Sequence, residues 1–294
     1  MARIKLIVTG DMEKAALHES LQRVFPAQRL CENGTDHEDV VWDTPRKLDC
    51  ATTHQLVHGA KLSTPMPALV QAMFSEVGPG KKGSPADLVV VIDDVELGNL
   101  GQEAIVIDHF RRAVNDKLAT CTPVEQQRYR LLLQQKCSFH LLRPMVESYL
   151  FGDAAALVAS GVPVNETPRL VSTDVEQFET DDPAWLPACH TENARPRPGV
   201  PGWRHELHPK HYLEHLTGRG PVVYDETTHG KRALLDLDWA GVPKLPVETP
   251  FVRSLFEDLA DWFGVPNPLG AGSLDPRFYP LTTVRRASLL LRNM

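Results

Sequence analysis

The stretch Leu88-Val89-Val90-Val91-Ile92-Asp93-Asp94-Val95-Glu96 decides the fold class, because an unbroken apolar run ends there in three carboxylates. Such a β-branched run is typical of a central parallel strand that is buried on both faces. Acidic side chains at the carboxyl end of such a strand lie where open α/β sheets place their ligands. Crowded carboxylates repel one another, so the cluster predicts a compensating cation, and hard oxygen ligands favour Mg²⁺ or Mn²⁺. The alternative is that two of the three carboxylates cap the next helix or face solvent.

Composition places the chain among ordinary globular proteins. It has 294 residues, of which 42% are hydrophobic and 23% charged, and a net charge of −7. This balance argues against a protein that coats nucleic acid as a whole, although a local basic face stays open. There is no apolar stretch long enough to cross a bilayer and no signal-peptide pattern. The five cysteines are scattered without Cys-x-x-Cys spacing, so we expect a cytoplasmic protein with no membrane association.

Strand and helix patterns alternate along the first half of the chain. Residues 3–8 predict a strand, Thr9-Gly10-Asp11 a turn, and residues 13–25 a helix. Residues 27–60 are weakly periodic and suggest loop and a short strand. Further helices are predicted at 65–77, 102–118 and 123–135, the last with a threonine cap and proline at its first position, and another strand at 137–142.

The second half has a different character. Pro144 is expected to open a helix, and residues 160–205 are rich in proline, threonine and acid, which suggests an irregular excursion. Helical patterns return at 209–216, 230–239 and 250–263. We therefore predict an α/β fold with a mostly parallel, Rossmann-like sheet flanked by helices. Its core is formed by residues 1–160, and a mostly helical C-terminal portion, residues 161–294, packs on it.

Three turns combine sharp backbone geometry with acid, and each follows a predicted strand. The first carries Glu13, the second carries Asp93, Asp94 and Glu96, and the third carries Glu147. In a parallel sheet, all three turns would meet at the same edge. Carboxylates that converge in this way can hold one or two divalent ions, which would clamp the attacking and leaving oxygens in phosphodiester cleavage.

The order of these elements resembles the Toprim fold of topoisomerases, primases and OLD-type nucleases. The chain is also similar to an uncharacterised Toprim-like family that is encoded beside ATPases in bacterial defence loci. The segments that carry this likeness are Phe139–Asp153, His208–Leu213 with the order His-Pro-Lys-His-Tyr-Leu, and Tyr224–Lys231. The likeness extends loosely over residues 4–260.

The resemblance implies a metal-dependent nuclease that is an effector subunit of a prokaryotic anti-phage defence system and works with an ATPase partner. It implies that Asp93, Asp94 and Glu96 hold Mg²⁺ (or Mn²⁺), with Glu13 and Glu147 completing the set, in a Mg²⁺-dependent endonuclease. Nucleic acid, as DNA or RNA, is then the substrate. Whether the protein forms a homo-oligomer is left open.

One position departs from the Toprim pattern. Toprim enzymes usually carry a glutamate directly before the first glycine, and this chain has Thr9 there. Asp11 or Glu13 would have to substitute for that glutamate. The alternative function is a catalytically inactive Toprim-like scaffold that binds a partner protein or nucleic acid.

Several candidates have structural alternatives. Glu13 suits the first turn of its helix, where the macrodipole favours an anion, and Asp11 suits the N-cap. Glu147 could be buried as the ion-pair partner of Arg143, whereas Arg143 could instead bind a phosphate bidentately.

Basic and imidazole side chains supply the predicted nucleic-acid contacts. His208 and Lys210 suit a phosphate-backbone contact, for which an exposed helix start is the alternative. The spacing of His208, His211 and His215 also permits a zinc site, which we consider the weaker hypothesis. Lys81 and Lys82 lie in a loop before the acidic strand and could approach the backbone, although a solvated loop is the simpler interpretation.

Overall fold

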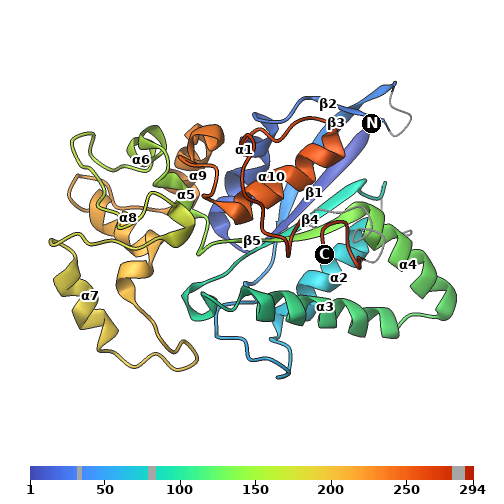
Figure 1. Ribbon diagram of the computed structural model, residues 1–294, viewed down its shortest axis with the longest axis horizontal. Helices are drawn as coiled ribbons and strands as arrows, with labels where there is room; N and C mark the ends of the chain where they lie inside the picture. Colours follow the sequence, from blue (N-terminus) through green and yellow to red (C-terminus); the bar gives the residue numbers. More distant parts are fainter. Residues whose placement is uncertain (32–34, 79–83, 280–288) are drawn as a thin grey trace.

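The protein is an α/β protein with a five-stranded, mostly parallel sheet, seen in a computed structural model that describes residues 1–31, 35–78, 84–279 and 289–294 (Figure 1). The strand order is β2-β3-β1-β4-β5. Strand β1 runs parallel to β3 and β4, β4 runs parallel to β5, and β2 is antiparallel to β3. The strands are β1 (Ala2–Val8), β2 (Gln28–Leu30), β3 (His37–Lys47), β4 (Leu88–Asp94) and β5 (Cys137–Leu142).

Strand β4 lies inside the sheet, and all seven of its residues are buried. Both of its edges are paired, with β1 on one side and β5 on the other. This confirms the strand predicted from the apolar run, because only a strand covered on both faces can bury so continuous a set of β-branched side chains. Its last residue, Asp94, pairs in register with Leu142 at the end of β5.

Helices cover both faces of the sheet (Figure 1). One face packs against α2 (Pro65–Val77) and α3 (Glu103–Ala119), through residues such as Ile7, Val89 and Val91. The other face packs against α10 (Pro250–Phe263) and the helix after β1, through Leu6 and Val90. That first helix begins as a π-helical turn (Glu13–Leu17) and continues as α1 (His18–Gln22). Alternate side chains of each strand therefore enter two separate hydrophobic clusters.

The C-terminal part is largely helical, and its short helices lie beyond the carboxyl ends of the strands (Figure 1). They are α7 (Leu186–Asn193), α8 (Pro209–Thr217) and α9 (Lys231–Asp236), and they are preceded along the chain by α5 (Glu147–Leu150) and α6 (Ala154–Ala159). The hydrophobic core continues across residue 160, since the rings of Tyr149 and Trp239 lie 5.7 Å apart and those of Phe25 and Phe263 lie 5.1 Å apart. The division at residue 160 stays a prediction.

Two stretches differ from the sequence-based prediction. Strand β3 runs for eleven residues where loop and a short strand were expected, because its exposed side chains are polar and Pro45 interrupts the pattern. Helix α7 lies inside the predicted irregular stretch and has almost no amphipathic pattern to reveal it. By contrast, α4 (Pro123–Lys136) begins at Thr122 with the predicted capping box, in which Thr122 and Glu125 exchange hydrogen bonds. Among the described residues, no helix has the length and apolarity needed to cross a membrane.

The stack of Phe110 on Phe139 joins α3 to β5, with ring centroids 3.9 Å apart and both side chains fully buried. We expect Phe110→Ala to lower the free energy of unfolding by about 3–5 kcal/mol, because it removes the stack and leaves a cavity. Urea unfolding measures this change. Val124→Ala, at a 79% exposed position of α4, serves as the control and should change it by less than about 0.5 kcal/mol. Equal effects of the two substitutions would contradict this description of the core.

Candidate functional site

A cavity of about 250 Å³ opens at the carboxyl edge of the sheet, where β1, β3, β4 and β5 end. Its wall combines residues from the strand ends with residues from the C-terminal part. They are Thr9, Gly10, Asp11, Glu13, Lys47, Cys50, Asp94, Glu96, Met145, Val146, Glu147, His208, Lys210, His211 and Glu226. The predicted acids Glu13, Asp94, Glu96 and Glu147 are thus brought together, and so are His208 and Lys210.

Glu13 lies folded back over the turn that follows β1. A methyl carbon added at Gly10 would be 2.0 Å from Glu13 Oε2, so only glycine leaves room for this carboxylate. The side chain is 2% exposed, and burial raises its pKa to about 7, with the charges of Glu226 and Asp93 raising it further. Glu13 is therefore a buried acid of the cavity, and it also lies in the first turn of its helix, as the structural alternative expected.

Asp94 has a buried oxygen without a partner. Among the described residues, nothing donates a hydrogen bond to its Oδ1, although the side chain is only 8% exposed. Burial raises its pKa well above the usual range, and the negative charges of Glu13, Glu96 and Glu147 raise it further. An unsatisfied buried carboxylate oxygen is costly unless a ligand or cation satisfies it, so this atom marks the cavity as a candidate binding site.

Glu96 is held in a strained backbone conformation, with φ 60° and ψ 155°. A residue with a Cβ rarely adopts these angles, and such strain costs about 1–3 kcal/mol and often occurs at functional sites. Hydrogen bonds from Glu96 N to the Pro144 carbonyl (2.9 Å) and from Asn99 N to the Glu96 carbonyl (3.1 Å) hold the turn. Burial raises the pKa of Glu96 to about 7, Asp93 raises it further, and Lys210 lowers it.

Glu147 opens α5 and is 4% exposed. Burial raises its pKa to about 8, and the charges of Glu13 and Glu226 raise it further. The alternative in which Arg143 pairs with it is wrong, since Arg143 Nε donates to Glu103 Oε1 at 2.9 Å and its Nη1 donates to the Glu176 carbonyl.

Asp93 differs from Asp94 because successive side chains of a strand point to opposite faces. Its Oδ1 accepts hydrogen bonds from Thr9 Oγ1 (2.8 Å) and Asp94 N (3.1 Å), and its Oδ2 accepts one from Ala51 N (3.2 Å). Burial raises its pKa to about 6, and these hydrogen bonds oppose the rise. Both oxygens are already satisfied and Asp93 is outside the cavity wall, so this geometry favours a positioning role over the predicted ligand role.

The opposite wall comes from the C-terminal part. His208 caps α8, and its Nδ1 accepts a hydrogen bond from His211 N at 3.4 Å. The rings of His208 and His211 stack with centroids 3.7 Å apart, and burial lowers the pKa of His211 to about 4. Lys210 forms an ion pair with Glu226. These imidazoles are neutral near pH 7, so Lys210 is the cation of this wall.

Some residues of the cavity were missed by the sequence reasoning. Glu226 lies within the segment Tyr224–Lys231, which the sequence analysis selected as a whole without naming this acid. Lys47 ends β3 and Cys50 follows it, in a stretch whose strand was not recognised, so no pattern marked them. Asp11 was expected to cap the helix, but the capping position shows no side-chain hydrogen bond, and the Asp11 carboxylate pairs with Lys47.

Other candidates lie elsewhere. Arg143 faces a separate cavity beside Glu176, which weakens its predicted contact with nucleic acid at the acidic cavity. His215 stacks on Trp185 and contacts Arg219 (2.9 Å), so it is not part of a zinc site with His208 and His211. Lys81 and Lys82 lie outside the described residues.

The donor chemistry of the acidic cavity suits a hard divalent cation, because six carboxylates line it and one oxygen is unsatisfied. Within the described residues, no group of three or more His, Cys, Asp or Glu side chains is already arranged as a ligand set. A metal ion would therefore have to draw these carboxylates together by side-chain rotation, replacing the protons that their raised pKa values favour.

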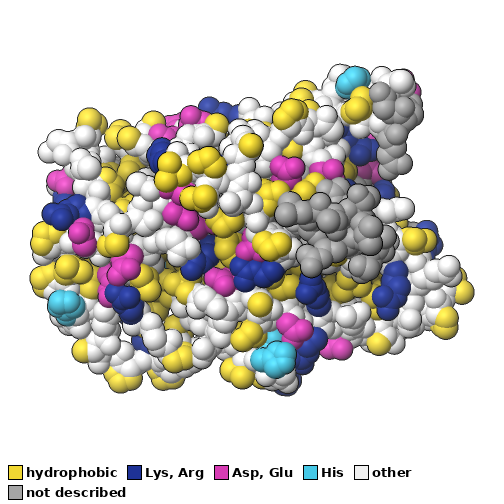
Figure 2. Space-filling view, in the orientation of Figure 1, with side chains coloured by type: hydrophobic (Ala, Val, Ile, Leu, Met, Phe, Trp, Pro, Cys, Tyr) yellow, Lys and Arg dark blue, Asp and Glu magenta, His cyan; other side chains and the backbone are white. Residues whose placement is uncertain are grey.

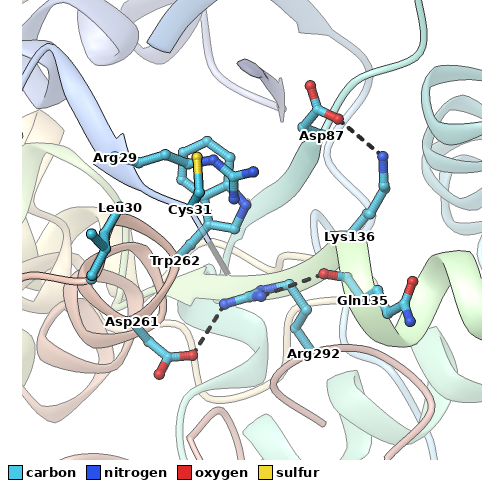
Figure 3. A pocket seen from close by; sticks show the side chains of 10 residues that line it. Arg29, Leu30, Cys31, Asp87, Gln135, Lys136, Asp261, Trp262 and Arg292 are labelled. Atoms are coloured by element: carbon cyan, nitrogen blue, oxygen red, sulfur yellow. Dashed lines mark hydrogen bonds and ion pairs between the residues drawn. The ribbon is translucent and has the colours of Figure 1, made fainter. Parts of the chain in front are cut away.

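A larger cavity, of about 440 Å³, lies at the opposite edge of the sheet, where β4 and β5 begin (Figure 3). Its basic side chains all have partners: Lys136 pairs with Asp87 (3.0 Å), Arg292 pairs with Asp261 (3.3 Å), and Arg29 lies 4.3 Å from the Trp262 ring centre. Among the described residues that line it, no buried carboxylate oxygen lacks a hydrogen-bond partner to point to a ligand, so the acidic cavity is the stronger candidate.

Comparison of the chain with protein-family models, curated proteins and solved structures finds no match. The chemistry of the cavity therefore has to be argued from its own residues.

The raised pKa values predict how stability depends on pH in metal-free protein. The folded-state pKa values of Glu13, Glu96 and Glu147 are about 7, 7 and 8, against 4.5 as the ordinary value. The folded state therefore binds more protons than the unfolded state in this window, and the free energy of unfolding falls as the pH rises from about 5 to about 8. Urea unfolding in chelator should show the decline.

Glu147→Gln tests the origin of this decline. The substitution should reduce the fall in the free energy of unfolding between about pH 5 and pH 8 by a few kcal/mol, since one pKa unit corresponds to about 1.4 kcal/mol. Asp116→Asn, at an exposed position of α3, should leave the slope unchanged. Parallel slopes for the parent protein and Glu147→Gln would show that the Glu147 carboxyl is not perturbed.

Proposed function

We propose that this protein is a Mg²⁺- or Mn²⁺-dependent nuclease with a Toprim-like fold. The observation that carries the proposal is the unpartnered Oδ1 of Asp94 in a cavity lined by two further buried acids, Glu13 and Glu147, and by the half-buried Glu96, at the sheet edge where ligands of α/β proteins bind. Proteins rarely keep so many shielded carboxylates together without a cation to offset their repulsion. The parallel strand order is compatible with a Toprim-like arrangement.

Asp94 and Glu96 would hold the ion, with Glu13 and Glu147 completing its shell. Asp93 would act through Asp94 and Thr9 as a positioning residue. When bound, such an ion supplies a strong local positive charge that stabilises the developing negative charge of phosphodiester cleavage and acidifies water.

The chain itself supplies the proton transfer and the phosphate contacts. The pKa of Glu147, raised to about 8, lets this carboxyl hold or accept a proton near neutral pH, as a general acid or base must. Lys210 and His208 line the wall opposite the acids and are placed to meet phosphate oxygens.

The alternative function is an inactive scaffold that binds a partner or nucleic acid. Thr9 favours the scaffold, because a Toprim enzyme would carry a further acid at this position. Here the Thr9 hydroxyl donates a hydrogen bond to Asp93 instead. Glu13 offsets this loss in the nuclease proposal, since its carboxylate folds back over Gly10, next to Thr9.

The biological setting rests on the resemblance to the Toprim-like family alone. It comprises a role as an effector of anti-phage defence, an ATPase partner and a cytoplasmic location. A nuclease of this kind acts on DNA or RNA, and assays on both classes would separate them.

Divalent-cation binding is the most direct test of the proposed function. We expect Mn²⁺ to stabilise the protein against unfolding by about 2–3 kcal/mol at roughly 100 times its dissociation constant. Asp94→Asn should abolish this stabilisation and reduce Mn²⁺-dependent cleavage of nucleic acid by at least about 100-fold. Thermal unfolding and gel assays on DNA and RNA measure the two effects.

Asp116→Asn is the matched control and should behave like the parent protein. A parent protein that Mn²⁺ neither stabilises nor activates would support the scaffold. Cleavage that survives Asp94→Asn would refute the role given to that residue.

A further inference from the structure

Two ion pairs lie on the wall of the acidic cavity, one from the sheet and one from the C-terminal part. Lys47 pairs with Asp11, and Lys210 pairs with Glu226. The lysine side chains are 32% and 33% exposed, so water and solutes reach both. Among the described residues of the wall, these are the two side chains with a permanent positive charge.

The backbone fixes where each lysine stands. Lys47 ends β3 and pairs in parallel register with Val8, so it lies beside the turn that carries Gly10 and Glu13. Leu48 N donates to the Val8 carbonyl at 2.9 Å and holds this strand end in place. Lys210 lies in the first turn of α8, whose N-terminus faces the same cavity through His208.

The charge of Lys210 reaches the acids, since it lowers the pKa of Glu96 and of Glu147. Asp11 and Glu226 are partly exposed acids of the wall, with side chains 48% and 25% exposed. Ion pairs this exposed contribute little to stability and exchange partners readily. A phosphate, which carries several strong acceptor oxygens, can replace either carboxylate as the lysine's partner.

The overall charge of the protein does not favour a polyanion. The net charge is −7, and on the face shown in Figure 2 the Lys and Arg side chains are interspersed with Asp and Glu. Local cations at the cavity must therefore provide the attraction for a phosphate backbone.

We propose that Lys47 and Lys210 form a phosphate clamp across the acidic cavity. Each lysine leaves its carboxylate, Asp11 or Glu226, and binds a phosphate that flanks the scissile one on a nucleic-acid strand. The two carboxylates hold the lysines in position in the free protein and compete with the incoming strand. This inference rests on the proposed function, because it takes the scissile phosphate to lie among the buried acids.

Binding of a labelled single-stranded oligonucleotide in Ca²⁺ tests the clamp without requiring cleavage, and fluorescence anisotropy measures the affinity. Lys47→Ala and Lys210→Ala should each weaken binding about tenfold, and each should reduce the steepness of the salt dependence by about 0.7 in the log–log slope. Asp11→Asn and Glu226→Gln should instead tighten binding a few-fold, because they release the lysine from its competitor. Opposite signs for the two members of one pair are the signature, since a purely structural ion pair would give the same sign for both.

Lys136→Ala is the matched control. It breaks the pair with Asp87 at the opposite edge of the sheet, and its side chain is 30% exposed, so affinity should stay within about twofold of the parent protein. The clamp would be overturned if Lys47→Ala and Asp11→Asn shifted the affinity in the same direction, or if neither changed it.

A parallel cleavage assay in Mg²⁺ and Mn²⁺ separates the two proposals. Lysine-dependent binding without cleavage would uphold the clamp and refute the nuclease. Cleavage with an affinity that does not depend on either lysine would uphold the nuclease and refute the clamp.

Discussion

Repulsion among buried carboxylates is the constraint around which this protein is built. Glu13, Asp94, Glu96 and Glu147 share one cavity, and burial raises the pKa of each, with further increases from neighbouring negative charges. Without a cation, the folded state can keep these groups together only by protonating some of them. The same carboxylates that destabilise the metal-free protein by their repulsion are suited to bind a hard divalent ion.

The strand order of the sheet brings these carboxylates together. Strands β1, β4 and β5 run parallel, so their carboxyl ends share one edge and the turns after them face each other. Packing of α2 and α3 on one face and α10 on the other buries β4 completely and fixes the depth of Asp94. The C-terminal part then closes the opening with His208 and Lys210, which explains why the largely helical half belongs to the same site.

Much of this fold was readable from the sequence, and so was the gathering of its acids. The run from Leu88 to Asp94 predicted a buried parallel strand. The turns that follow the predicted strands indicated that Glu13 and Glu147 would lie at the same edge of the sheet. The sequence could not separate Asp93 from Asp94, because their different surroundings depend on hydrogen bonds from Thr9 and Ala51 that only the folded chain provides. Lys47 was not predicted to lie at the site, because the many polar residues of β3 kept the sequence pattern from indicating a long strand. Glu226 and His211 reach the cavity through tertiary packing, which local patterns do not record.

The central claim is that a divalent cation relieves the repulsion in this cavity. Crystals soaked in Mn²⁺ and measured near the manganese absorption edge test it most directly, since anomalous scattering locates the ion without assumptions about activity. The account predicts a manganese peak at coordination distance, about 2.2 Å, from Asp94 Oδ1, with Glu13, Glu96 or Glu147 turned toward it. A saturating soak that leaves the four carboxylates without a peak, or that places the ion elsewhere, would contradict it.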